Sequence, residues 1–132
     1  MRYLLDTHVL IWTLTNVKKL PIPVKSLLED QSNNTFVSSV TLWEMAIKIR
    51  SGRLEPFGHW TTAVPYIHKL GFQTLSLSPD EAATSGSLTE ETHFDPFDRM
   101  LIWQAIQLDL VLLSGDGQFK KFKKDGLKLL WK

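Results

Sequence analysis

The chain alternates between short apolar runs and longer segments that have apolar residues on one helical face. Runs of β-prone or apolar residues at 3–5, 35–38, 72–75, 110–113 and 127–131 predict strands. The run at 110–113 is wholly apolar, which is typical of a central strand buried on both faces of a parallel sheet. These five runs therefore predict a sheet whose middle is enclosed by other elements.

Helices are expected between the runs. Apolar residues recur every three or four positions over 9–14, 24–30, 39–50, 60–70 and 95–108, and Pro with acids at 78–81 indicates another helix start. Gly52 follows the segment 39–50 in the usual place of a helix-terminating glycine. Strands alternating with helices imply right-handed crossovers, so we expect one three-layer α/β/α domain over residues 1–132, with a central parallel sheet.

Composition narrows the class of protein. The 132 residues are 43% hydrophobic and contain no cysteine, which excludes disulfides, thiol nucleophiles and cysteine zinc sites. No apolar run approaches the roughly 20 residues of a membrane helix, and the start lacks the pattern of a secretory signal. We therefore expect a cytoplasmic protein with no membrane partner.

The net charge is only +1, but the charges are unevenly placed. Six acids and no Lys or Arg lie between Asp80 and Asp98, whereas six lysines and one acid, Asp125, lie between Lys120 and Lys132. An acidic centre beside basic surface could hold metal ions and attract a polyanion. A solvated tail is the alternative interpretation of the lysines.

Four acids fall on the carboxyl edge of the predicted sheet. Asp6 follows the first strand, Glu44 lies near the start of the helix after the second, Asp98 begins the helix that leads to the fourth, and Asp116 follows the fourth. The carboxyl ends of parallel strands share the edge at which ligands bind. We therefore expect all four carboxylates in one pocket.

Each acid also has a purely structural interpretation. Asp6 or Asp95 could cap a helix, residues 41–44 have the form of a capping box, and residues 116–117 form a common turn. Together, however, four carboxylates would repel one another, and a divalent cation would relieve that repulsion. All-oxygen ligation suits Mg²⁺ or Mn²⁺, so the predicted reaction is metal-assisted hydrolysis of a phosphodiester.

Three stretches resemble a known family. LLDTH at 4–8, VS at 37–38 followed by LWEMAIK at 42–48, and HFDPFDRMLI at 93–102 look like the PIN-domain ribonucleases of the VapC toxin type. The resemblance implies a Rossmann-like α/β/α fold and an Mg²⁺- or Mn²⁺-dependent endoribonuclease acting on RNA. It also implies a homodimer that a small antitoxin neutralises, with Asp6, Glu44, Asp98 and Asp116 as the catalytic and metal-binding acids.

Other polar residues have candidate supporting roles. Thr7, Ser38 and Ser114 could orient the acids or act as caps and turns, and we expect His8 and His93 to be mainly structural. Trp12, Trp43 and Trp103 could stack on a base, although core or dimer packing is the more common use. Candidate contacts to the RNA backbone are Lys48, Arg50, Arg53, Arg99, Lys120 and Lys121.

Two other function classes compete with the nuclease. A phosphoacceptor signalling domain would need a lysine just beyond a late central strand, and SGDG at 114–117 has none; a dehalogenase-like phosphatase would need an acid at position 8, which is His8. A non-catalytic binding module could use the acidic edge to receive a basic partner peptide. That reading is compatible with an inhibitor that inserts a basic side chain there.

Overall fold

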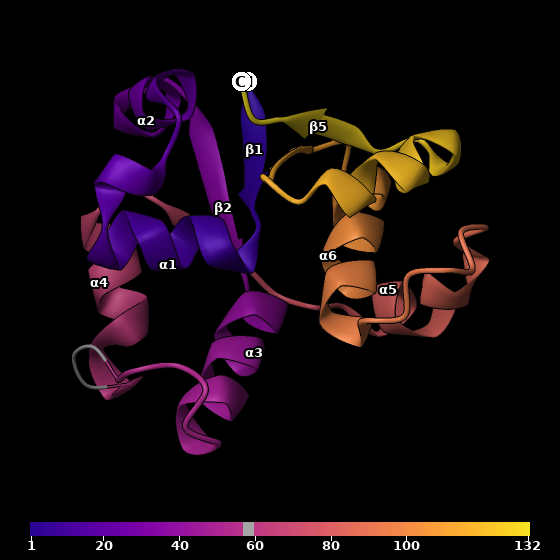
Figure 1. Cartoon of the computed structure of the whole chain (residues 1–132), viewed down its shortest axis with the longest axis horizontal. Helices are drawn as coiled ribbons and strands as arrows, with labels where there is room; N and C mark the ends of the chain where they lie inside the picture. The colour runs from indigo at the N-terminus through magenta and orange to yellow at the C-terminus, as the bar shows by residue number, and fades with distance from the viewer. Residues whose placement is uncertain (57–59) are drawn as a thin grey trace.

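A single parallel sheet organises the chain. The computed structural model describes residues 1–56 and 60–132 (Figure 1). Its five strands lie in the order β3-β2-β1-β4-β5, and all neighbours are parallel. They are β1 (Arg2–Leu5), β2 (Asn34–Ser38), β3 (Gln73–Leu75), β4 (Val111–Leu113) and β5 (Lys128–Leu130). The order confirms the predicted parallel sheet and puts β1 in its centre.

Helices connect successive strands. The α-helices are α1 (Thr7–Thr15), α2 (Ile22–Glu29), α3 (Ser39–Arg50), α4 (Ala63–Lys69), α5 (Pro79–Thr84) and α6 (Pro96–Gln107). Short 3-10 helices are η1 (Val17–Lys19), η2 (Trp60–Thr62), η3 (Ser85–Ser87) and η4 (Gly117–Asp125). The predicted helix at 60–70 is thus a 3-10 turn followed by α4, and the lysine-rich segment is η4.

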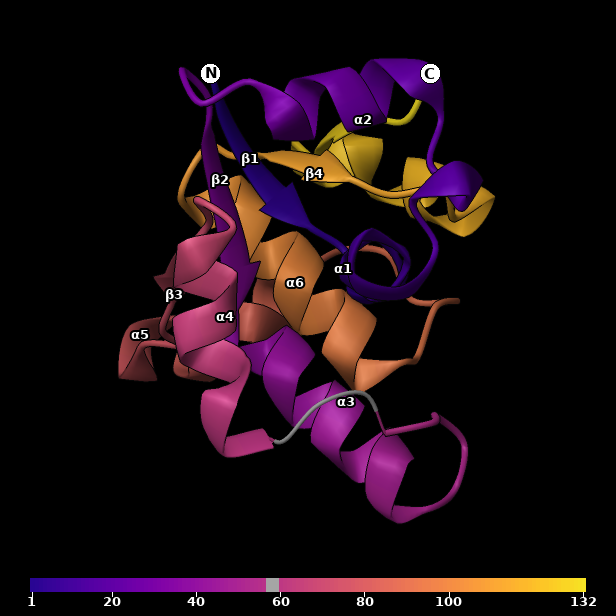
Figure 2. The same cartoon turned by 90° about the vertical axis from the view of Figure 1, so that its left-hand side faces the viewer.

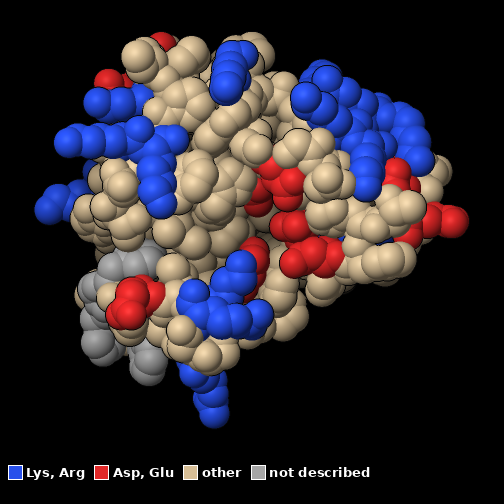
Figure 3. Space-filling view, viewed as in Figure 1, with Lys and Arg blue, Asp and Glu red and all other residues tan. Residues whose placement is uncertain are grey.

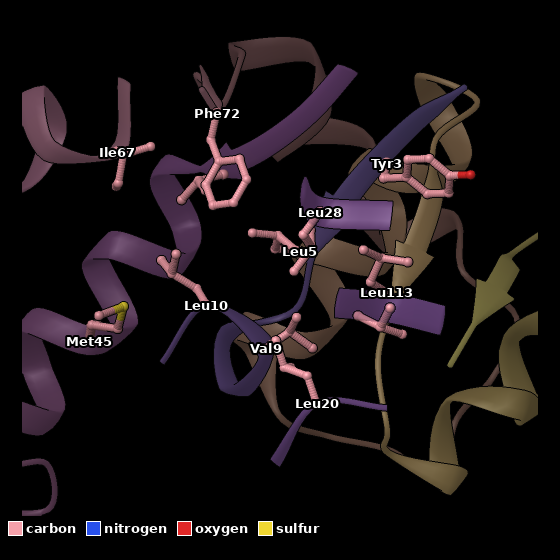
Figure 4. Close-up of a cluster of buried hydrophobic side chains, with 12 residues drawn as sticks. Tyr3, Leu5, Val9, Leu10, Leu20, Leu28, Met45, Ile67, Phe72 and Leu113 are labelled. Atoms are coloured by element: carbon pink, nitrogen blue, oxygen red, sulfur yellow. The ribbon is translucent and has the colours of Figure 1, made fainter. Parts of the chain in front are cut away.

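Two apolar clusters make the fold three-layered. Leu5 and Leu113 point to one face of the sheet, where they pack with residues of α1, α2 and α4 (Figure 4). Leu4 and Leu112 point to the other face and pack with residues of α6 and η4. All four leucines are completely buried, as expected for central strands with helices on both faces. Figure 2 shows α2 and α6 on opposite sides of β1.

Side-chain caps fix where the helices begin at the carboxyl edge. Asp6 caps α1 and Asp95 caps α6, which confirms both predicted caps. The capping box predicted at 41–44 is wrong, because Ser38 caps α3 by accepting the Val40 N–H. Thr41 and Glu44 are consequently free to point toward α1 instead of closing their own helix end.

Two further features of the structure concern the end of α3 and the length of the helices. Gly52, just after α3, has φ of 77°, a left-handed conformation that glycine adopts without the steric cost of a side chain. Within residues 1–56 and 60–132, none of the helices has the length and apolar character needed to cross a membrane.

Candidate active site

Asp6 directly follows β1 and is held by three donors. Its side chain is nearly inaccessible, with 3% of the residue exposed. Oδ1 accepts the Thr7 backbone N–H at 2.8 Å, and Oδ2 accepts the Ser114 hydroxyl at 2.7 Å. The Nδ1 atom of His8 lies 3.0 Å from the same Oδ2. Three donors on one buried carboxylate hold it in a single orientation.

His8 has a defined tautomer in this network. Its Nε2 accepts the backbone N–H of Gly115 at 3.0 Å, so the proton of the neutral ring lies on Nδ1 and is donated to Asp6. Trp12 and Trp131 flank the ring, with centroids 4.9 and 5.7 Å away. The structural role expected for His8 thus has a particular form: it holds the Asp6 carboxylate against the turn after β4.

Glu44 projects from α3 toward α1 and is also buried, with 4% of the residue exposed. Its Oε1 accepts the Thr7 hydroxyl at 2.7 Å, and its Oε2 lies 2.7 Å from the Lys48 ammonium one turn later. Thr7 therefore orients two acids, one through its backbone and one through its side chain. Ser38, in contrast, acts as a cap and donates its hydroxyl to Gln104.

Asp98 lies in the first turn of α6 with its side chain 19% exposed. Its Oδ2 lies 2.9 Å from Nε2 of His93. Burial raises the pKa of Asp98 to about 6, and the charges of Asp6, Asp95 and Glu44 add to the rise, although the His93 hydrogen bond opposes it. The structure therefore brings Asp98 within electrostatic reach of Asp6 and Glu44.

Asp116 follows β4 and joins this edge through Ser114. The Asp116 backbone N–H donates to the Ser114 hydroxyl at 3.1 Å, and that hydroxyl donates to Asp6. The Asp116 carboxylate accepts the Gln118 N–H at 2.8 Å and caps η4. The turn predicted at 116–117 is therefore present, and Ser114 links the Asp116 backbone to the Asp6 carboxylate.

The four acids share one edge, but each is held by partners within the protein. Figure 3 shows acidic side chains gathered near the middle of one face, with Lys and Arg around them. Over residues 1–56 and 60–132, no three acidic, His or Cys side chains are positioned to ligate a metal ion together. The donor chemistry, carboxylate oxygens under mutual repulsion, nevertheless suits a hard divalent cation.

Arg99 supports the loop that carries His93. Its Nη1 donates to the backbone carbonyls of Glu90 at 2.7 Å and of His93 at 2.9 Å, and its guanidinium lies 5.8 Å from the Phe122 ring centroid. Sequence reasoning missed this role, because the two carbonyls belong to a loop without a recognisable pattern. Among the other candidate RNA contacts, Lys121 donates to Thr92 at 3.3 Å.

The candidate tryptophans differ in environment. Trp103 is buried and donates its indole N–H to Thr84, whereas Trp12 packs beside His8 and Trp131. Trp43, next to Glu44, is 60% exposed and contacts Phe97 at a centroid distance of 5.0 Å. Core packing therefore accounts for Trp103 but not for Trp43.

Comparison with known proteins shows which family and which solved structures this chain resembles. The sequence model of the PIN domain matches residues 3–125. A chain of VapBC2 from Rickettsia felis, crystallised with a DNA fragment from its promoter, superposes with a TM-score of 0.73 and 17% identity over 100% of both chains. DNA-bound VapBC from Salmonella typhimurium gives a TM-score of 0.69 and 21% identity, over 98% of this chain and 97% of that one.

VapBC-1 from nontypeable Haemophilus influenzae is similar at a TM-score of 0.67 and 18% identity, covering 98% of this chain and 97% of the other. Comparison with curated protein sequences gives no match. These structural relatives share the fold of this chain. Because the PIN model also spans nearly the whole sequence, the chain belongs to the PIN-domain family.

Proposed function

We propose that this protein is a metal-dependent endoribonuclease and the toxin of a toxin–antitoxin pair, acting in the cytoplasm. The observation that carries the proposal is the gathering of buried carboxylates at the carboxyl edge of the sheet. Asp6 and Glu44 share Thr7 as a donor, and burial, with their two charges adding to it, raises the pKa of Asp98. Burying three carboxylates together lowers the stability of the protein. A function that needs a divalent cation would explain why the protein nevertheless has this arrangement. Membership of the PIN-domain family supports the same assignment.

The residues that would hold Mg²⁺ or Mn²⁺ are Asp6, Glu44, Asp98 and Asp116. When bound, such an ion supplies a water of lowered pKa and stabilises charge on the phosphate oxygens. The protein contributes orientation: Thr7, Ser114 and His8 fix the oxygens of Asp6, and Thr7 fixes one oxygen of Glu44. Carboxylates fixed before binding need little reorganisation, which favours catalysis.

Basic side chains beside the acids would position the RNA backbone. We assign this role to Lys48 and Arg50 in the last turn of α3, to Arg53 just after it, to Arg99 in α6, and to Lys120 and Lys121 in η4. Lys48 is already anchored on Glu44. Such contacts supply affinity without sequence choice and weaken as salt rises.

An apolar groove supports an antitoxin as partner. A cavity of about 760 Å³ between α1, α3 and α4 is lined mostly by apolar residues, among them Leu14, Met45, Ile49 and Val64. Val64 is 41% exposed, so the groove presents apolar surface to solvent. The relatives from R. felis and S. typhimurium are VapBC structures, and we propose that a segment of the corresponding antitoxin fills this groove. Val64→Glu should then abolish antitoxin binding and leave RNA cleavage unchanged.

Exposed aromatic residues beside the site suit a homodimer. Trp43 is 60% and Phe94 80% exposed, and Trp43 packs edge-on against Phe97. We propose that these three residues form the face between two copies of the chain. Light scattering on the purified protein should give a dimer mass, and Trp43→Lys should give a monomer.

The nuclease assignment is tested by cleavage of total RNA. Purified protein is incubated with Mg²⁺, with Mn²⁺ or with chelator, beside Asp98→Asn and the matched surface variant Asp80→Asn. We expect discrete, metal-dependent cuts that fall by at least about hundredfold in Asp98→Asn and persist in Asp80→Asn. Cleavage by Asp98→Asn at the normal rate would overturn the assignment, and a folded protein that never cuts but captures a basic peptide would favour the binding module.

A further inference from the structure

A second, smaller cavity adjoins the acidic edge at the ends of β4 and β5. Its volume is about 400 Å³, and the turn after β4, including Gly115 and Gly117, forms one wall. Lys120 and Lys123 from η4, with Trp131 and Lys132, form the remainder of its polar and aromatic lining. Cavities of this size accommodate small organic ligands such as a nucleotide.

The lysines of this region divide into two groups. Lys121, Lys124 and Lys128 are used within the protein, by Thr92, Glu90 and Asp109 respectively. Lys120, Lys123 and Lys132 line the cavity and, over the part of the chain that the structure describes, form no ion pair. Within residues 1–56 and 60–132, the lysines of this region that line the cavity are thus the ones whose side chains have no protein partner, which leaves them available to a phosphate.

Trp131 gives the cavity an aromatic wall of fixed position. Its ring packs against His8 and Trp12, with centroids 5.7 and 6.0 Å away. A Cβ at position 115 would come within 2.7 Å of the indole, so the absence of a side chain at Gly115 lets the ring lie against the turn. Single-stranded RNA offers a base that can stack on the half-buried indole and a phosphate that can bind the nearby ammonium groups.

We infer that this cavity is a nucleotide subsite, which holds one nucleotide of single-stranded RNA by stacking its base on Trp131 and binding its phosphate with Lys120 and Lys123. The subsite deepens the proposed nuclease function and rests on it. Asp116 lines the same cavity, and Ser114 links that residue to Asp6. The bound nucleotide therefore lies directly beside the phosphodiester that the acidic edge would cleave.

Binding of mononucleotides tests the subsite without any cleavage. We would titrate ¹⁵N-labelled protein in chelator with AMP, with UMP, with adenosine and with inorganic phosphate. The expected result is saturable shifts of the Gly115 and Gly117 amides and the Trp131 indole N–H with AMP and UMP. In Lys120→Gln/Lys123→Gln the affinity should fall at least about threefold, and the control Lys18→Gln/Lys25→Gln, with the same loss of charge, should bind normally. Shifts elsewhere, or an equal response in both double variants, would overturn the subsite.

Binding of an RNA strand gives an independent measure. A labelled single-stranded octaribonucleotide is bound to Asp98→Asn protein over a range of salt, with the deoxy octamer as a comparison. Losing the contact to this one phosphate should lower the slope of log affinity against log salt by about 0.7 in Lys120→Gln/Lys123→Gln. Trp131→Leu should weaken RNA binding about fivefold or more without changing the salt slope, because stacking is lost and no ionic contact is. An unchanged slope in the lysine variant would contradict the proposal.

The two proposals fail in different ways. If wild-type protein cuts RNA but the lysine variant keeps its KM and shows no loss of AMP binding, the subsite is wrong and the nuclease stands. If AMP binds at Trp131 but no RNA is cut with any metal, the nuclease is wrong and the cavity is a nucleotide site of another kind.

Discussion

Asp6 and Asp98 lie on the same edge of the sheet in opposite environments. Asp6 is 3% exposed and accepts hydrogen bonds from Thr7, Ser114 and His8. Among the described residues, the one side chain bonded to the Asp98 carboxylate is His93, and burial beside other carboxylates raises the pKa of Asp98 to about 6. Local donors compensate the burial of Asp6, whereas Asp98 bears the cost of its own burial and of repulsion by neighbouring acids, which the His93 hydrogen bond offsets only in part.

This difference shows how a fold can hold several carboxylates close together and remain stable. Hydrogen bonds to a charged group are worth roughly 1.5–3 kcal/mol each, so the Asp6 network offsets much of the cost of burying that carboxylate. The remaining cost falls on Asp98, which lies at the start of α6, where the helix dipole offsets only part of it. A ligand that brings positive charge would therefore stabilise the Asp98 side more than the Asp6 side.

The largest effect is expected from Asp6→Asn. The new amide NH₂ would face the Ser114 hydroxyl and the His8 N–H, both of which donate to Asp6 Oδ2 in the native protein. We expect a loss of about 3 kcal/mol in the free energy of unfolding, measured by urea denaturation in chelator. Asp80→Asn, an exposed acid, should change it by less than about 0.5 kcal/mol. Equal stability of the two variants would contradict the network.

Asp98→Asn should increase the stability of the protein, whereas Asp6→Asn should decrease it. Because the folded protein holds the Asp98 proton more tightly than an unfolded chain, this group lowers stability as the pH rises from 3.8 to about 6. Removing the charge should therefore raise the free energy of unfolding by about 2 kcal/mol at pH 7, less any loss of the His93 hydrogen bond. The gain should shrink toward zero near pH 3.5, and a gain independent of pH would contradict the repulsion.

Gly115→Ala would test the packing behind the Asp6 network. Its Cβ would come within 2.7 Å of the Trp131 indole and displace the turn whose N–H binds His8. We expect a loss of about 1.5 kcal/mol in thermal or urea unfolding. Gly117→Ala is the matched control, since nothing lies within 4 Å of a Cβ there. If both variants lost the same stability, crowding at Trp131 would not be the cause.

The smallest effect is expected from Thr7→Val. It removes the hydroxyl that donates to Glu44 at 2.7 Å while keeping the volume of the side chain. We expect a loss of about 1 kcal/mol and a lower cleavage rate, because Glu44 would lose its fixed orientation. Thr7→Ser retains the hydroxyl and should restore the rate, which separates orientation from packing.

Local patterns were enough to predict most of the fold. The apolar runs marked all five strands, and Asp6, Asp95 and Ser78 are helix-start residues as expected. The segment 39–50 is helical over the predicted bounds. The one wrong cap, at 41–44, arose because Ser38 satisfies the helix start before Thr41 can. Periodicity and capping act over a few residues, so a sequence displays them directly.

The sequence by itself determined the order of strands and helices and where four acids lie along them. Because alternating strands and helices leave the chain few other topologies, that order predicts one shared edge for the four acids. Only the tertiary structure decided how each acid is held. The Gly115 N–H meets His8 across 107 positions of sequence, and Ser114 meets Asp6 across 108. The burial of Asp98 and its repulsion by other acids likewise depend on elements far apart in the chain. The same is true of which lysines bind protein partners and which line the small cavity. These properties come from distances in space, and no local pattern records them.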